Sequence, residues 1–137
     1  DCAQPLWISM TLEDDAEASD SRLRSGELLS DALSAINLDQ IDAILFNCSQ
    51  PEVMAKAVTL SAKRLPSNID IGVYANGFTP ISNTIQANDG YSTTRDDLTP
   101  QDYLAFAKQW QALGATIIGG CCGIGPEHIA LLDALKD

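Results

Sequence analysis

The stretch ATIIGGCCGIGPEHI, Ala115 to Ile129, places two adjacent cysteines and several glycines between an apolar run and the start of a helix. The run from Ala115 to Cys122 is apolar and rich in β-forming residues, as buried strands are. Pro126 suits the first turn of a helix, because a proline there gives up no intrahelical hydrogen bond. A buried strand that leads directly into a helix is the repeating unit of a parallel α/β sheet.

The same strand–helix order occurs three times earlier in the chain. Strands are predicted over Pro5–Leu12, Ile41–Cys48 and Asp70–Asn76, and helices over Ser25–Ile36, Pro51–Arg64 and from Thr99 to about Leu113. Ser25 is the candidate N-cap of the first helix. No hairpin motif joins the strands, so we predict an α/β fold in which residues 1–137 form a single domain of four consecutive parallel βα units. The predicted strand order follows the chain, with the helices on one side of the sheet.

The charge of the chain limits its partners. Its formal net charge is −11, from 19 acidic and 8 basic residues. Such a surface repels phosphate backbones and anionic membranes, so neither nucleic acid nor a membrane is an expected partner. No apolar run approaches the roughly 20 residues of a membrane span, and no signal peptide opens the chain, so we expect a cytoplasmic protein. One acidic cluster is expected to be a solvated loop, formed by Glu13, Asp14, Asp15, Glu17 and Asp20.

The cysteines are the main candidates for chemistry: Cys2, Cys48, Cys121 and Cys122. In a reducing compartment, scattered cysteines are metal ligands, catalytic groups or core residues more often than disulfides. The chemistry of parallel α/β folds lies at the carboxyl ends of the strands. Cys48 ends the second predicted strand, while Cys121 and Cys122 end the fourth, so all three are expected at one face. Three thiolates with an open fourth position are what a catalytic zinc needs.

Two other interpretations of the cysteines stay open. In one, a non-catalytic domain uses them as a thiol redox centre or as a structural zinc site, which would need a fourth ligand from Cys2 or His128. In the other, they simply pack in the core. His128 is the only histidine and is expected to be structural rather than catalytic. Asn76 ends the third strand on the same face, where a strand-end cap is the plain interpretation. Trp7 and Trp110 are expected in the core.

Several motifs resemble the homocysteine S-methyltransferase family: FNCSQPE (Phe46 to Glu52), VYANGF (Val73 to Phe78), LEDD…RLRSGE (Leu12 to Glu27) and above all GGCCGIGPEHI. The resemblance covers essentially the whole chain. It implies a TIM (β/α)₈ barrel, of which these four units are equivalent to strands five to eight. It also implies zinc bound through Cys48, Cys121 and Cys122, and methyl transfer to the zinc-bound thiolate of homocysteine to give methionine. Asn76 would approach the zinc or the substrate.

The departure from the family is large, because half of the barrel has no counterpart here. A complete barrel needs roughly 250 residues, and by resemblance the other half carries the carboxylates that hold the homocysteine amino group. We expect the isolated chain to be inactive, and to pair with a missing amino-terminal half or to form a homodimer. A small methyl donor is favoured, S-methylmethionine or S-adenosylmethionine. The long loop from Gly77 to Leu98 could cover the site, with Asn83, Asn88, Asp89, Tyr91 and Arg95 as candidate contacts.

Overall fold

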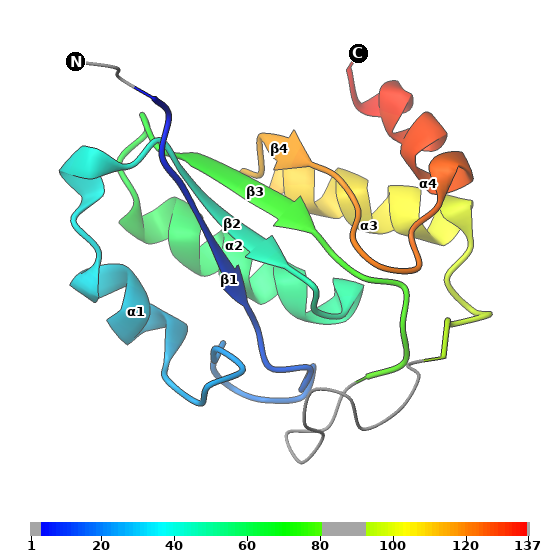
Figure 1. Ribbon diagram of the computed structural model, residues 1–137, viewed down its shortest axis with the longest axis horizontal. Coiled ribbons are helices and arrows are strands. Elements are labelled where there is room, and N and C mark those ends of the chain that lie inside the picture. The colour runs from blue at the N-terminus through cyan, green and yellow to red at the C-terminus, as the bar shows by residue number, and fades with distance from the viewer. Residues whose placement is uncertain (1–3, 81–92, 137) are drawn as a thin grey trace.

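The sheet has the predicted topology. The computed structural model describes residues 4–80 and 93–136. Its four strands are β1 (Trp7–Thr11), β2 (Ala43–Asn47), β3 (Asp70–Tyr74) and β4 (Ile117–Ile118). They form one parallel sheet in the order β1-β2-β3-β4 (Figure 1). The α/β prediction of consecutive parallel units is therefore confirmed, and the arrangement is consistent with half of a TIM barrel.

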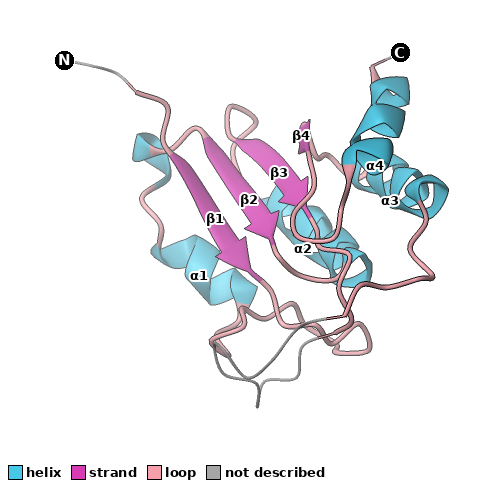
Figure 2. Ribbon diagram, turned by 45° about the vertical axis from the view of Figure 1, so that its right-hand side comes forward, coloured by secondary structure: helices cyan, strands magenta, loops and turns pink. Residues whose placement is uncertain are grey.

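Helices follow the strands in the same alternation. They are α1 (Leu29–Ala35), α2 (Pro51–Arg64), α3 (Pro100–Ala112) and α4 (Pro126–Leu131), with short 3₁₀ helices η1 (Leu38–Gln40) and η2 (Leu132–Leu135). Figures 1 and 2 show α2 and α3 against one face of the sheet. The core lies between them, where Phe46 and Val73 of the sheet and Met54, Val58 and Trp110 of the helices are fully buried.

Local sequence signals explain why α2 and α3 begin where they do. Pro51 opens α2, with Glu52 in its first turn and basic residues in its last turn, the charge order that the helix dipole favours. Thr99 caps α3 by accepting a hydrogen bond from Asp102 N, while the Asp102 side chain accepts one from Thr99 N. This reciprocal pair satisfies two amides that the helix itself leaves unbonded.

The predicted start of the first helix is wrong. Helix α1 begins at Leu29 rather than Ser25, and the Ser25 hydroxyl donates to the Glu27 carboxylate instead of capping the helix. The cause is a turn at Gly26, whose φ of 103° is readily adopted only by glycine. The turn is closed by hydrogen bonds from Leu23 N to Glu27 O and from Gly26 N to Leu23 O.

The exposure of the two tryptophans shows which face of the sheet the helices cover. Trp110 is fully buried, as predicted, whereas Trp7 is 55% exposed, so its predicted core position is wrong. Neighbouring strand residues point to opposite faces. Because Ile8 and Met10 pack against the core, Trp7 faces the other way, where the described residues cover it only in part.

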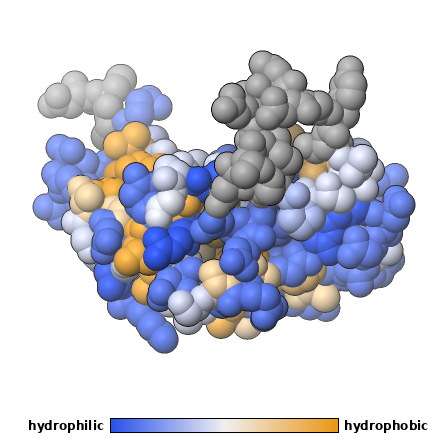
Figure 3. Space-filling view, turned by 90° about the horizontal axis from the view of Figure 1, so that it is seen from below, coloured by the Kyte–Doolittle hydropathy of each residue, from blue (hydrophilic) through white to orange (hydrophobic). Residues whose placement is uncertain are grey.

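Further apolar surface lies at the two edges of the sheet. Leu6, just before β1, is 49% exposed. Beside β4, an open groove of about 960 Å³ is lined by residues that include Ile118, Ile129, Leu132 and Leu135. The face seen in Figure 3 is largely hydrophilic, with one apolar patch at the left and smaller ones along the lower edge. Within the described ranges, no helix is both long enough and apolar enough to cross a membrane.

Candidate metal centre

The backbone beyond the strands brings the three predicted cysteines together. Residues 75–77, which continue β3, lie between the two cysteine-bearing segments. Cys48 N donates to Tyr74 O (3.3 Å) on one side, while Cys121 N donates to Ala75 O (2.9 Å) on the other. Gly77 N in turn donates to Cys122 O at 2.8 Å. The convergence expected from strand ends of a parallel sheet is therefore present.

The three sulfur atoms form one cluster. All lie within 4.8 Å of one another, and the Sγ atoms of Cys121 and Cys122 are 3.9 Å apart. Ligands on a tetrahedral zinc with Zn–S bonds of about 2.3 Å stand roughly 3.8 Å apart. The donor type and the Cys121–Cys122 spacing fit a metal that prefers sulfur.

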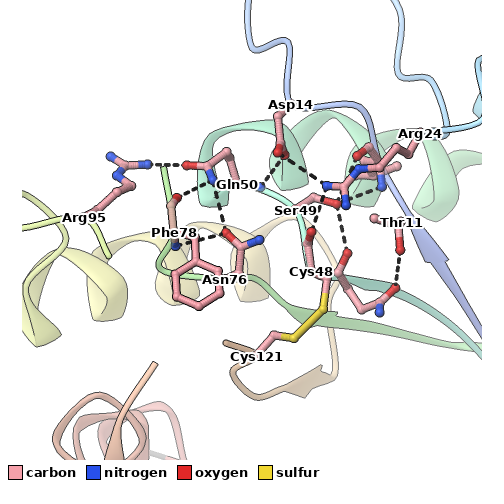
Figure 4. A network of polar contacts seen from close by, with 12 residues as sticks. Thr11, Asp14, Arg24, Cys48, Ser49, Gln50, Asn76, Phe78, Arg95 and Cys121 are labelled. Carbon is pink, nitrogen blue, oxygen red and sulfur yellow. Dashed lines mark hydrogen bonds and ion pairs between the residues drawn. A yellow bond between two sulfur atoms is a disulfide. The ribbon is translucent and has the colours of Figure 1, made fainter. Parts of the chain in front are cut away.

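The oxidation state differs from the expectation of reduced cysteines. Cys48 and Cys121 are joined as a disulfide, with Cα atoms 5.8 Å apart, and Cys122 is unpaired (Figure 4). The sequence predicted that these two cysteines would lie at one face of the sheet, but a reducing compartment made a disulfide between them the less expected outcome. Because metal binding needs thiolates, the disulfide and a three-thiolate centre are alternative states of the same side chains.

Polar contacts from Arg24, Asp14 and Ser49, here called the clamp, hold the backbone around Cys48. Cys48 has a φ of 46° and is the sole non-glycine residue with a positive φ among those described. Arg24 Nη2 donates to the Cys48 carbonyl oxygen at 2.9 Å. Asp14 accepts a hydrogen bond from Gln50 N at 2.8 Å and lies 3.4 Å from Arg24 Nη2. Buried Ser49 accepts one from Leu12 N at 2.8 Å.

The clamp corrects the solvated-loop interpretation for Asp14 alone, because Asp15, Glu17 and Asp20 are exposed, as that interpretation predicts. The Asp14 side chain is only 1% exposed, because it turns inward to the first turn of α2. Composition gave no hint of this, since the neighbouring acidic residues look alike in sequence. The useful signal was position: Asp14 follows β1, whose partner strand β2 ends at the candidate ligand Cys48.

Asn76 is part of a second buried network. It is 2% exposed, and its Oδ1 accepts hydrogen bonds from Gln50 Nε2 (3.1 Å) and Phe78 N (3.3 Å). Gln50 Oε1 accepts one from Arg95 Nη1 at 2.8 Å. Hydrogen bonds to Asp97 and then Glu52 raise the pKa of Arg95 above its usual range, so the guanidinium stays charged.

His128 supports the loop that follows the vicinal cysteines. Its Nδ1 accepts from Gly125 N at 3.2 Å, its Nε2 lies 3.2 Å from Leu98 O, and its ring meets Tyr103 edge-on. These contacts favour the structural interpretation of this residue. In the same loop, Gly123 has a φ of 77°, and a Cβ there would lie 3.1 Å from the Gly77 carbonyl carbon.

Some sequence candidates lie outside the described residues: Cys2, Asn83, Asn88, Asp89 and Tyr91. Arg95, from the same predicted loop, lies inside. It does not contact the sulfur atoms directly but reaches Asn76 through Gln50.

Comparison with known proteins connects this site to a family. A profile described as homocysteine S-methyltransferase matches residues 1–135. Similar proteins include homocysteine S-methyltransferase 4 of Zea mays, 32% identical over 136 residues, which are 97% of this chain and 36% of that protein. The homocysteine S-methyltransferase of Escherichia coli (strain K12) is 29% identical over 134 residues, 93% of this chain and 38% of that protein. The selenocysteine methyltransferase of Astragalus bisulcatus is 26% identical over 126 residues, 91% of this chain and 34% of that protein. The chain thus spans little more than a third of the length of these relatives, and by its match over nearly all of its residues it belongs to the homocysteine S-methyltransferase family.

Proposed function

We propose that this chain is the zinc-binding, carboxyl-terminal half of a barrel that transfers a methyl group to the thiolate of homocysteine, giving methionine. The observation that carries the proposal is the cluster of three cysteine sulfur atoms at the carboxyl ends of β2 and β4. Sulfur ligands favour zinc, and three protein ligands leave a fourth position for the substrate. A reducing cytoplasm would keep the three side chains as thiols.

The residues of this chain would divide the work between holding the metal and shaping its surroundings. Cys48, Cys121 and Cys122 would be the protein ligands. When bound, zinc would act as a Lewis acid that keeps the homocysteine thiol deprotonated near neutral pH, against a free thiol pKa of about 8.5. Arg24 and Asp14 fix the turn that presents Cys48, and His128 fixes the loop that presents the other two.

In this proposal, the amino-terminal half of the barrel is supplied by residues outside this sequence. The exposed Trp7 and Leu6 on the β1 side and the apolar groove beside β4 are the surfaces on which we place the amino-terminal half, from a longer protein or a second chain. A homodimer of two halves is the alternative, although two copies would bring together two charges of −11. By resemblance, the missing half carries the carboxylates that orient homocysteine, so these residues alone should be inactive. We favour S-methylmethionine or S-adenosylmethionine as the methyl donor.

The Cys48–Cys121 disulfide favours one competing function, a non-catalytic domain with a thiol redox centre. The other form of that alternative, a structural zinc, needs the three cysteines reduced and a fourth protein ligand. The two functions differ in whether the fourth metal position is open. Addition of homocysteine should change the coordination of a catalytic zinc, as seen by X-ray absorption, and should leave a closed structural site unchanged.

The test begins with metal content. The reduced chain is expected to bind about one zinc, and Ala substitution of Cys48, Cys121 or Cys122 should abolish binding, whereas Cys2→Ala serves as the matched control. Equal zinc in all four variants would refute the metal centre. The second step is methionine production from homocysteine with each donor, by this chain alone and after addition of the amino-terminal half of a relative. Absence of turnover by the completed barrel with every donor would refute the methyltransferase function.

A further inference from the structure

Tyr103 of α3 donates a hydrogen bond to the segment that leads into the vicinal cysteines. Its hydroxyl lies 2.7 Å from Gly119 O and 3.5 Å from Ala75 O, and its side chain is fully buried. Burial raises the pKa of Tyr103 well above its usual value, so the hydroxyl keeps its proton and acts as a donor. A helix that covers the sheet is therefore bonded to the backbone two residues before Cys121.

The hydroxyl replaces a backbone donor in the ladder that continues β3 and β4. Gly119 N donates to Val73 O and Cys121 N donates to Ala75 O, both at 2.9 Å. A regular parallel ladder would also pair Ala75 N with Gly119 O, between these two bonds. Among the described residues, the hydrogen bond that Gly119 O accepts comes from Tyr103 instead. The backbone ladder is thus interrupted beside the cysteines, and a side chain of α3 supplies a donor there.

The ring that carries this hydroxyl is held on two sides. Trp110 of the same helix meets it edge-on, with ring centroids 5.5 Å apart, and His128 of α4 meets it edge-on at 5.9 Å. His128 is itself fixed by the hydrogen bond that it accepts from Gly125 N. These contacts keep the Tyr103 hydroxyl at Gly119 O.

The segment that Tyr103 contacts has few other restraints. Gly119 and Gly120 have no side chains to pack, and glycine has the greatest backbone freedom. Gly120 cannot be exchanged for a larger residue without a shift, because a Cβ there would lie 2.4 Å from Ile124 Cγ2. The next residues, Cys122 and Gly123, are exposed. The position of the two cysteines therefore depends on a few hydrogen bonds to the backbone, and Tyr103 supplies one of them.

We propose that Tyr103 is a positioning residue of the metal centre, which holds Cys121 and Cys122 in place through its hydrogen bond to Gly119 O. This inference rests on the proposed zinc site. Metal ligands must be held within about 0.5 Å of the geometry that the metal requires. Without the hydroxyl, the glycine segment would sample more positions, and a tetrahedral metal tolerates few of them.

Tyr103→Phe tests the proposal, because it removes the hydroxyl and keeps the ring. The reduced, full 137-residue chain is used, with Co²⁺ as the probe. Gln111→Met is the matched control, since it removes another side-chain donor of α3 to a backbone carbonyl, Leu135 O at 2.9 Å, in the groove beside β4. Three quantities are measured: Co²⁺ affinity, the ligand-field bands at saturating Co²⁺, and hydrogen exchange of the Cys121 N–H without metal. Circular dichroism confirms the fold.

Tyr103→Phe is expected to weaken Co²⁺ binding about tenfold, the lower end of what loss of outer-shell partners costs at other metal sites. Its ligand-field bands should change in energy or intensity, because loosened ligands depart from a single tetrahedral arrangement. A loss of global stability alone would leave the bands of the saturated, folded protein unchanged. The Cys121 N–H should exchange several-fold faster than in the parent, and Gln111→Met should match the parent in all three measurements.

Three outcomes would overturn the proposal. Parental Co²⁺ affinity and bands in Tyr103→Phe would show that the ligands do not depend on the hydroxyl. An unchanged exchange rate of the Cys121 N–H would show that the segment is held without it. Equal losses of affinity in Gln111→Met would assign the effect to α3 as a whole. Absence of Co²⁺ binding by the parent chain would instead refute the metal centre itself, and with it this inference, whereas a parent that binds while Tyr103→Phe matches it refutes the inference alone.

Discussion

Replacing Asp14 with Ala removes the carboxylate that ties the loop after β1 to the first turn of α2. One carboxylate oxygen accepts from the buried Gln50 N–H at 2.8 Å, and the other lies 3.4 Å from Arg24. A buried N–H left without an acceptor costs about 1–3 kcal/mol. The ion pair adds about 1 kcal/mol at most, because the Arg24 side chain is 33% exposed and solvent screens it. We therefore expect Asp14→Ala to lower the free energy of unfolding by about 1–4 kcal/mol.

Asp14→Asn separates the two contributions, because it keeps the acceptor for Gln50 N and loses only the charge. It should cost about 1 kcal/mol. The assay is urea unfolding of the reduced chain, followed by the fluorescence of buried Trp110. Asp39→Asn, the same change at an exposed position, should stay within about 0.5 kcal/mol of the parent. An Asp14→Ala variant as stable as the parent would refute the clamp, and an Asn variant as unstable as the Ala variant would refute the dominance of the Gln50 hydrogen bond.

Other predictions concern the helix cap and the sheet. Thr99→Ala should lower the free energy of unfolding by about 1 kcal/mol in the same urea assay, through loss of the α3 cap, and an unchanged unfolding midpoint would contradict it. Hydrogen bonds from Thr99 hold the pKa of Asp102 below its usual value. A carboxyl group whose pKa is lower in the folded state stabilises the fold above its unfolded pKa, and this stabilisation is lost as the pH falls. The loss in free energy of unfolding caused by Asp102→Asn should therefore shrink below about pH 4. A difference in free energy of unfolding between parent and variant that does not vary with pH would argue against this. Gly72→Ala would place a Cβ 2.6 Å from Leu45 Cγ and should cost about 1–3 kcal/mol. Leu45→Ala in the same chain should recover part of that cost, and simple additivity of the two changes would rule out the clash.

Local signals were enough to predict some elements and not others. The sequence bounds α2 correctly because a proline, an acidic first turn and a basic last turn all agree with the apolar pattern. It misplaced the start of α1 because the turn at Gly26 is stabilised by pairing with the loop after β1, through the Leu12–Leu23 bridge, which local propensity cannot register. Trp7 was misplaced because hydrophobicity does not reveal which face of a sheet its neighbours cover.

Some features of the candidate site could likewise be predicted from the sequence, and others could not. The convergence of Cys48 with the vicinal cysteines followed from strand ends alone, because a parallel sheet places all of these ends at one edge. The roles of Arg24 and Arg95 did not follow. Both act through backbone or side-chain atoms of residues far away in the chain, Cys48 and Gln50. Such contacts depend on how loops fold over the sheet, and no spacing in the sequence records them.

The left-handed backbone of Cys48 has a consequence for protein engineering. A side chain with a Cβ pays about 1–2 kcal/mol for that conformation, whereas glycine adopts it with little steric penalty. Under reducing conditions, a Cys48→Gly variant should therefore tolerate more heat than Cys48→Ala. A directed-evolution library selected only for thermal tolerance would enrich glycine at this codon and delete the sulfur atom. Selection for stability and selection for sulfur chemistry favour different residues at this position, so a stabilised variant that keeps all three sulfur atoms must be screened for both at once.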